Sequence, residues 1–210
     1  MKRMKWMKKI FLCCTLGIIM LTMSCAQTKT LHVWKDNAYG QISGKVLIII
    51  VADNDNIRSH FENVLAEKLA ERNIPAVASH KVFPQTEKAP DRELVMAKVK
   101  ELGIGSVIVG RPISREDFSS MTEGGTYLVP QNYYAGYYSV YSDSMSFVTV
   151  PGSSYDAEFF TLAVNLYDVP TEKLVWSFLS RVKVEQSRQA AVNPFIDTLM
   201  RQFQSSGIVK

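Results

Sequence analysis

Hydrophobic positions in the first half of the chain follow two different periods. Three segments are rich in aliphatic and β-branched residues: 45–52, 75–83 and 105–113. Nearly continuous apolar runs of this length are typical of strands buried on both faces of a sheet. Between them, 57–72 and 91–102 repeat apolar residues every three or four positions, which predicts two amphipathic helices. We expect Leu94, Val95 and Val99 on the buried face of the second helix, which Gly103 should end.

The second half of the chain changes to a period of two. Segments 157–169 and 173–185 alternate apolar and polar residues, and the short "PTE" between them predicts a β-hairpin. We expect Trp176 and Phe178 on the buried face of its second strand. Segment 189–205 then returns to helical spacing. The order β-α-β-α-β, followed by a hairpin and a helix, predicts an α/β (α+β) fold with a mixed sheet of about five strands.

The N-terminus has the pattern of an export signal. "MKRMKWMKK" carries five basic residues and no acid, and a short apolar run follows it. A basic segment before a short apolar segment is typical of a cleaved secretory signal. The apolar run is shorter than the roughly 20 residues that span a bilayer. We therefore expect residues 1–24 to be a signal peptide.

The end of this signal, "LTMSC", resembles a bacterial lipobox. Ser24 fits the small residue before the cysteine, whereas Thr22 and Met23 depart from the usual pattern. The resemblance implies that Cys25 carries a diacylglyceryl group and an acylated amine, and two or three acyl chains anchor a protein stably. Ala26 is not the aspartate of the inner-membrane retention signal, so the resemblance implies the outer membrane. We expect a lipid anchor and tether at 25–44, with a possible edge strand in it, and a single α/β domain at 45–210.

Removing the signal changes the charge and the cysteine chemistry. Five of the 24 Lys/Arg lie in residues 1–24, which leaves 19 against 20 Asp/Glu. The mature chain is therefore almost neutral and has no basic surplus for nucleic acid. Cys13 and Cys14 lie within the signal, so Cys25 is the single cysteine of the mature chain. This leaves no disulfide, thiolate metal site or free nucleophilic thiol.

A wider resemblance emerges from three quoted segments. "VLIIIVADNDNIRSHFENVLAEKLAERNI", "VKELGIGSVIVGR" and "NLYDVPTEKLVWS" resemble small bacterial envelope lipoproteins of unknown function. These are similar in fold to periplasmic domains of the curli-secretion, penicillin-binding-protein-activator and TolB N-terminal types. The resemblance covers about residues 45–208 and implies assembly or scaffolding in the envelope, without catalysis. A Tyr-rich insertion at 119–156 leaves the partner's identity open.

Acidic and histidine side chains offer little catalytic chemistry. Asp53 and Asp55 follow the first buried strand, where an acidic pair can bind Mg²⁺ in other α/β folds. We favour helix capping by Asp55 or Asn56 instead, because the third strand ends without a carboxylate. The three histidines, His32, His60 and His80, lack the spacing of metal ligands. We expect no metal, no cofactor and no enzyme activity; the alternative is an envelope hydrolase that uses Asp53, Asp55 and one histidine.

The stretch "YLVPQNYYAGYYSVY" is the strongest candidate for binding. Six of its fifteen residues are tyrosine and none is charged. Tyrosine gives a large contact area at a low cost in conformational entropy. The candidate binding residues are Tyr127, Tyr133, Tyr134, Tyr137, Tyr138 and Tyr141. The alternative is a hairpin that buries these rings against its own sheet.

These patterns together predict a function in the cell envelope. We expect a lipid-anchored protein of the outer membrane, facing the periplasm and not the cell surface, that acts as a non-catalytic binding or assembly module. A purely structural or stress-related lipoprotein is a further alternative. No Lys or Arg lies between Arg115 and Lys173 to hold anionic lipid, so we expect the Tyr-rich stretch to bind an envelope protein or a glycan.

Overall fold

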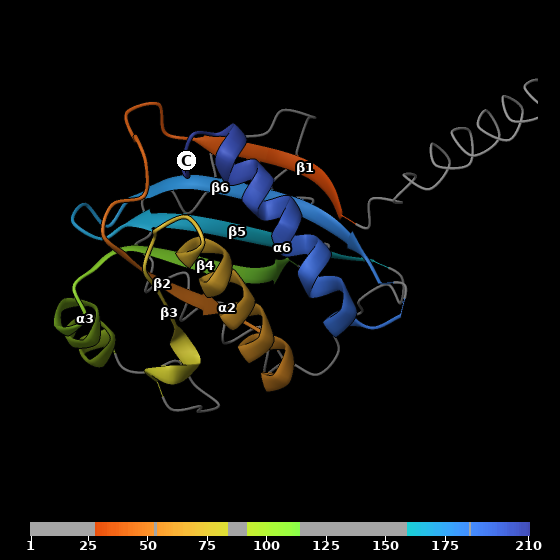
Figure 1. The fold of residues 1–210 in the computed structure, drawn as a ribbon, viewed down its shortest axis with the longest axis horizontal. Helices are drawn as coiled ribbons and strands as arrows, with labels where there is room; N and C mark the ends of the chain where they lie inside the picture. The colour runs from red at the N-terminus through yellow and green to blue at the C-terminus, as the bar shows by residue number, and fades with distance from the viewer. Residues whose placement is uncertain (1–27, 53, 84–91, 114–158, 185) are drawn as a thin grey trace, which may run out of the picture.

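The computed structural model describes residues 28–52, 54–83, 92–113, 159–184 and 186–210, which form one mixed sheet with helices on both faces (Figure 1). The strands are β1 (Thr28–Lys35), β2 (Lys45–Ile50), β3 (Ala76–Ala78), β4 (Ile104–Ile113), β5 (Phe159–Asp168) and β6 (Leu174–Lys183). The helices are α2 (Asp55–Ala70), α3 (Arg92–Glu101) and α6 (Arg188–Ser205), with a 3-10 turn, η2, at Ser79–Lys81. The predicted fold class is confirmed.

The sheet has the order β1-β6-β5-β4-β2-β3. Strands β3, β2 and β4 are parallel, and the other neighbours are antiparallel. The chain passes from β2 to β3 on one side and then returns to β4 on the other side of β2. The carboxyl ends of β2 and β4 therefore lie at a point where the direction of winding reverses, which is where open α/β sheets bind ligands.

The sheet extends further toward the N-terminus than the predicted domain. Strand β1 pairs with β6 along its length, from Thr28 opposite Val182 to Lys35 opposite Trp176. It adds a sixth strand to the predicted five or so. Further along the chain, Ile42 contacts the C-terminal segment, because its amide donates to the Ile208 carbonyl at 3.1 Å. Much of the expected tether at 25–44 is thus a folded part of the domain.

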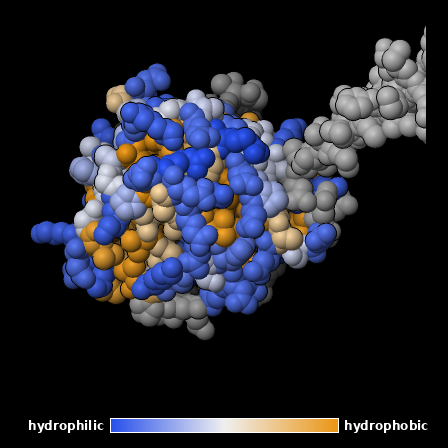
Figure 2. All heavy atoms as spheres, in the orientation of Figure 1, coloured by the Kyte–Doolittle hydropathy of each residue, from blue (hydrophilic) through white to orange (hydrophobic). Residues whose placement is uncertain are grey.

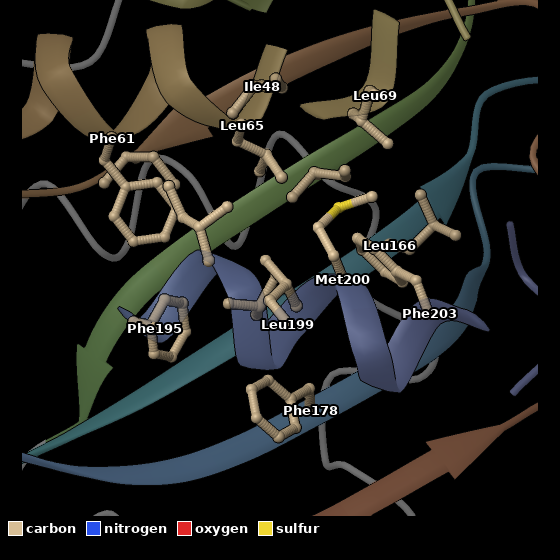
Figure 3. Close-up of a cluster of buried hydrophobic side chains, with 14 of the residues drawn as sticks. Ile48, Phe61, Leu65, Leu69, Leu166, Phe178, Phe195, Leu199, Met200 and Phe203 are labelled. Atoms are coloured by element: carbon tan, nitrogen blue, oxygen red, sulfur yellow. The ribbon is translucent and has the colours of Figure 1, made fainter. Parts of the chain in front are cut away.

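Helices α2 and α6 pack side by side on one face of the sheet and bury the larger core (Figure 1). Figure 3 shows Phe61, Leu65 and Leu69 of α2 pointing toward Leu199 and Met200 of α6. The rings of Phe61 and Phe195 are 5.4 Å apart between centroids. Burial of such side chains stabilises a fold by about 1.5–3 kcal/mol each. This helix pair is therefore the main support of the sheet.

The β5–β6 hairpin has the predicted phase. Leu166, Trp176 and Phe178 are fully buried in the core beneath α2 and α6. Tyr167 alternates to the opposite face and is also fully buried. The turn between the strands is fixed by Asp168, whose carboxylate accepts a hydrogen bond of 2.6 Å from the Thr171 hydroxyl.

Helix α3 packs on the opposite face through a narrower stripe than predicted. Val95 and Val99 are buried, one helical turn apart. Leu94 was expected beside them, but its side chain is 44% exposed. The helix touches the sheet mainly through β4, so it buries one line of side chains and turns Leu94 to solvent. Gly103 ends the helix as predicted, with a positive φ of 63°.

In the described part of the chain, no helix is both long enough and apolar enough to cross a membrane. The expected signal peptide, Cys25, Asp53 and the candidate tyrosines from Tyr127 to Tyr141 lie outside the described residues. The insertion that contains these tyrosines leaves the described structure after Ile113, at the end of β4. It returns at Phe159, at the start of β5.

Candidate functional site

An apolar pocket lies at the carboxyl ends of β2 and β4, at the point where the winding reverses. It encloses a cavity of about 70 Å³ that opens to solvent. Ile50 and Gly110 come from these two strands, Phe160 from the start of β5, Phe61 from α2 and Phe195 from α6. Figure 2 shows apolar surface between the polar outer surfaces of the two helices. The pocket is thus formed where the helices and the sheet edge meet.

The floor of the pocket depends on a residue without a side chain. A Cβ placed on Gly110 would lie 2.7 Å from Cδ1 of Ile50 and 3.8 Å from Cγ2 of Val164. All three residues line the pocket. A larger residue at position 110 would push the Ile50 side chain into the empty space, so glycine keeps the pocket open.

The chemistry of the pocket is almost entirely apolar. Among the described residues that line it, Arg188 is the single charged one, and none is a carboxylate or a histidine. Arg188 is the first residue of α6 and is exposed at the rim. The described lining is therefore suited to contact with hydrocarbon groups.

A buried polar network lies next to the pocket, and the sequence patterns did not predict it. Its centre is Glu62 on α2, whose side chain is completely buried. One carboxylate oxygen, Oε1, accepts hydrogen bonds from the Ile50 amide at 3.0 Å, from Nε of Arg58 at 3.3 Å and from the Ser79 hydroxyl at 2.6 Å. The other oxygen, Oε2, accepts from the His80 amide at 2.9 Å and contacts Nδ1 of His80 at 2.7 Å.

The network connects α2 to the ends of β2 and β3. Arg58 also donates from Nη2 to the Ser79 hydroxyl at 3.1 Å, so each polar group has a partner. Ile50 joins the network to the pocket, because its amide binds Glu62 while its side chain lines the pocket. The network therefore holds the pocket's floor in place against helix α2.

His80 is oriented by this network. With Nδ1 facing the Glu62 carboxylate, a neutral His80 carries its proton on Nδ1 and presents Nε2 as an acceptor. Its side chain is 23% exposed. In acid–base sites a carboxylate often orients a histidine through Nδ1 in this way. His80, however, does not line the apolar pocket. Among the described residues, no three His, Cys, Asp or Glu side chains are placed to hold a metal ion.

The other candidate side chains are not brought together. Asp55 lies in the first turn of α2, where its negative charge interacts favourably with the positive end of the helix dipole. His60 contacts α6 instead, with Nε2 3.1 Å from Oδ1 of Asn193. His32 lies on β1 and pairs with Leu179 of β6. The hydrolase alternative combined Asp53, Asp55 and one histidine; Asp53 lies outside the described residues, and the positions of Asp55 and the histidines do not support a common site.

The cap of α2 differs from the predicted one. Asn54, and neither Asp55 nor Asn56, is the N-cap residue of the helix. Its Oδ1 accepts hydrogen bonds from the Asn56 amide at 2.9 Å and from the Ile57 amide at 3.2 Å. The prediction was one or two residues late because the helix begins at Asp55, earlier than its first apolar residue indicates.

Burial changes the acid–base behaviour of three groups. Desolvation strongly raises the pKa of the Tyr167 phenol, although the hydrogen bond with Asn165 and the charge of Arg111 act in the other direction. Desolvation also raises the pKa of Tyr39 and lowers that of His32. In each case burial favours the neutral form, and none of the three groups lines the pocket.

The described fold defines a class: a mixed α/β domain with an apolar pocket at the switch point of its sheet. No protein-family model matches the chain, and no curated protein sequence matches it significantly. Solved structures of the PelC dodecamer from Paraburkholderia phytofirmans are similar to it at 10% identity, with a TM-score of 0.45, over 84% of this chain and 97% of that one. A PelC variant gives 9% identity and a TM-score of 0.44, over 81% and 97%. A likeness of this size assigns neither a family nor a function to the chain.

Proposed function

We propose that this protein is a lipid-anchored binding or assembly module of the bacterial outer membrane, facing the periplasm, without catalytic activity. The observation that carries the proposal is the apolar pocket at the switch point. Its described lining lacks carboxylates and histidines, so it supports binding and not bond-breaking chemistry. The lipobox resemblance at Cys25 supports the anchor and the location.

The Tyr-rich stretch is the proposed contact with an envelope protein or a glycan. Ile113 and Thr161 pair across β4 and β5, so the insertion that carries the stretch is attached to two neighbouring strands. Phe160, next to the second attachment point, lines the pocket. The points where the insertion joins β4 and β5 therefore lie at the same edge of the domain as the pocket, which supports a binding function for that edge.

The experiment replaces Tyr133, Tyr134, Tyr137 and Tyr138 together with serine. Wild-type and variant proteins are crosslinked in intact cells, and the captured envelope components are identified by mass spectrometry. We expect the variant to lose one defined partner while its melting temperature stays close to that of the wild type. Leu94→Ser is the matched control, because it removes an exposed apolar side chain elsewhere in the domain.

Two results would contradict the proposal. If the quadruple variant melts much earlier and still captures the same partner, the tyrosines belong to the core and not to a binding surface. If the purified protein instead hydrolyses an envelope ester, amide or glycoside, and Glu62→Gln or His80→Gln abolishes that activity, the module is an enzyme.

A further inference from the structure

The beginning of the described chain lies close to the pocket. Thr28 pairs with Val182 on one side of β6, and Phe160 pairs with Val182 on the other side. Neighbouring strands are about 4.8 Å apart, so Thr28 and Phe160 are separated by roughly 10 Å. In Figure 1, β1 and α6 begin at the same side of the molecule, to which the arrowhead of β4 points.

Cys25 lies three residues before Thr28, and three extended residues reach about 10 Å. A lipid attached to Cys25 is therefore within roughly 20 Å of Phe160, which lines the pocket. This step rests on the proposed function, because it takes the anchor as given. The edge that contains the pocket then lies next to the membrane surface.

The chemistry of the pocket complements one kind of membrane component. Its walls are aliphatic and aromatic side chains, and Arg188 adds a positive charge at the rim. An amphiphile with one hydrocarbon chain inside and an anionic headgroup outside satisfies both features.

We propose that the pocket binds the end of one acyl chain of an anionic phospholipid from the adjacent bilayer, with its headgroup near Arg188. The chain passes from one apolar environment to another, so the hydrophobic gain on leaving the bilayer is small. Binding is therefore reversible. It orients the domain by holding the pocket edge against the membrane, and it does not extract lipid.

The test uses the anchored full-length protein in vesicles that contain phosphatidylglycerol with a photoreactive diazirine at the end of one acyl chain. After illumination, crosslinked peptides are mapped by mass spectrometry. We expect crosslinks at the start of α2, the start of β5 and the first turns of α6. In matched vesicles with photoreactive phosphatidylcholine, labelling should be weaker, and Arg188→Gln should remove the difference between the two lipids.

Two variants fill the pocket. Ala52→Phe adds a ring at a partly exposed lining position, and Ala191→Leu adds a smaller group at a buried one. Either change should reduce pocket labelling to background while the melting temperature shows a folded protein. Gln189→Phe is the control: it adds the same ring in the first turn of α6, at an exposed position outside the lining, and should keep the labelling.

A second experiment tests the acyl-chain site independently of a lipid anchor at Cys25. Protein with Cys25→Ala is mixed with photoreactive lysophosphatidylglycerol below its micelle-forming concentration. Pocket labelling here, even if Cys25 proves to carry no lipid, supports the acyl-chain site while the anchor fails. Pocket labelling here but none in vesicles that hold the anchored protein overturns the bilayer as the source. Absence of pocket labelling in both arms overturns the proposal.

Discussion

Glu62 is the centre of the buried polar network that joins α2 to the ends of β2 and β3. Its carboxylate is wholly buried, and four groups besides Arg58 contact it directly: the Ile50 amide, the Ser79 hydroxyl, and the amide and Nδ1 of His80. A buried carboxylate is tolerated only when such partners compensate for the lost hydration. The network therefore stabilises one arrangement of α2, β2 and β3.

Removing the carboxylate should destabilise the domain strongly. In Glu62→Ala, Arg58 and Ser79 lose their common acceptor inside the protein, so we expect unfolding free energy to fall by about 3–5 kcal/mol. Glu67→Ala, on the exposed face of the same helix, should change it by less than about 0.5 kcal/mol. Urea unfolding followed by circular dichroism measures both. Equal effects for the two variants would show that the network contributes no stability.

The sequence contained a signal for this network at the residue scale. Arg58 and Glu62 occupy the same helical stripe as the buried residues Phe61, Leu65 and Leu69. Two charged residues four positions apart within an apolar stripe indicate a buried ion pair. The nearby His80 carried no such signal, because its pairing with Glu62 depends on where β3 ends.

Local sequence patterns predicted the helices and strands well where one face of the element is buried. They predicted the strand at the edge of the sheet less well. Segment 75–83 has the composition of a strand, yet β3 covers only Ala76–Ala78 and a 3-10 turn follows. The Ser79 hydroxyl and the His80 amide both bind Glu62, which turns the chain away from the sheet. A tertiary contact thus shortened the strand.

We expect substitutions in the core of the β5–β6 hairpin to lower the stability of the domain the most. The Trp176 ring is fully buried, 4.5 Å from the Phe203 ring, and its Nε1 donates to the Ser206 hydroxyl at 3.0 Å. We expect Trp176→Ala to lower the unfolding free energy by about 3–5 kcal/mol. Ser206→Ala removes only the hydrogen bond and should cost about 1 kcal/mol. A loss below about 1 kcal/mol for Trp176→Ala in denaturant unfolding would contradict the observed strand phase.

At the scale of the whole molecule, several features share one edge. The start of β1, the pocket and both attachment points of the Tyr-rich insertion lie where β4 ends and β5 begins. An anchor at Cys25 would place this entire edge at the membrane. Lipidation of Cys25 therefore remains the prediction on which the orientation of the molecule depends.

This prediction is tested in growing cells with a fatty-acid probe that labels lipoproteins. The wild-type protein should take up the probe and sediment with membranes. Cys25→Ala should lose the label and become a soluble periplasmic protein or an unprocessed precursor, because no thiol remains to carry the lipid. Cys14→Ala, within the signal, should behave as the wild type. An unlabelled wild-type protein, with Cys25→Ala fractionating normally, would refute the anchor.

The sequence by itself determined the fold class, the phase of the hairpin and most of the helices, because hydrophobic periodicity reports which face of each element is buried. It also provided the grounds for expecting export and a lipid at Cys25, since a signal and a lipobox are local motifs. Only the tertiary structure decided that β1 joins the sheet, that Glu62 gathers Arg58, Ser79 and His80, and that a pocket opens beside Gly110. These features join residues from distant segments, and their positions depend on strand order and crossover, which no local pattern specifies.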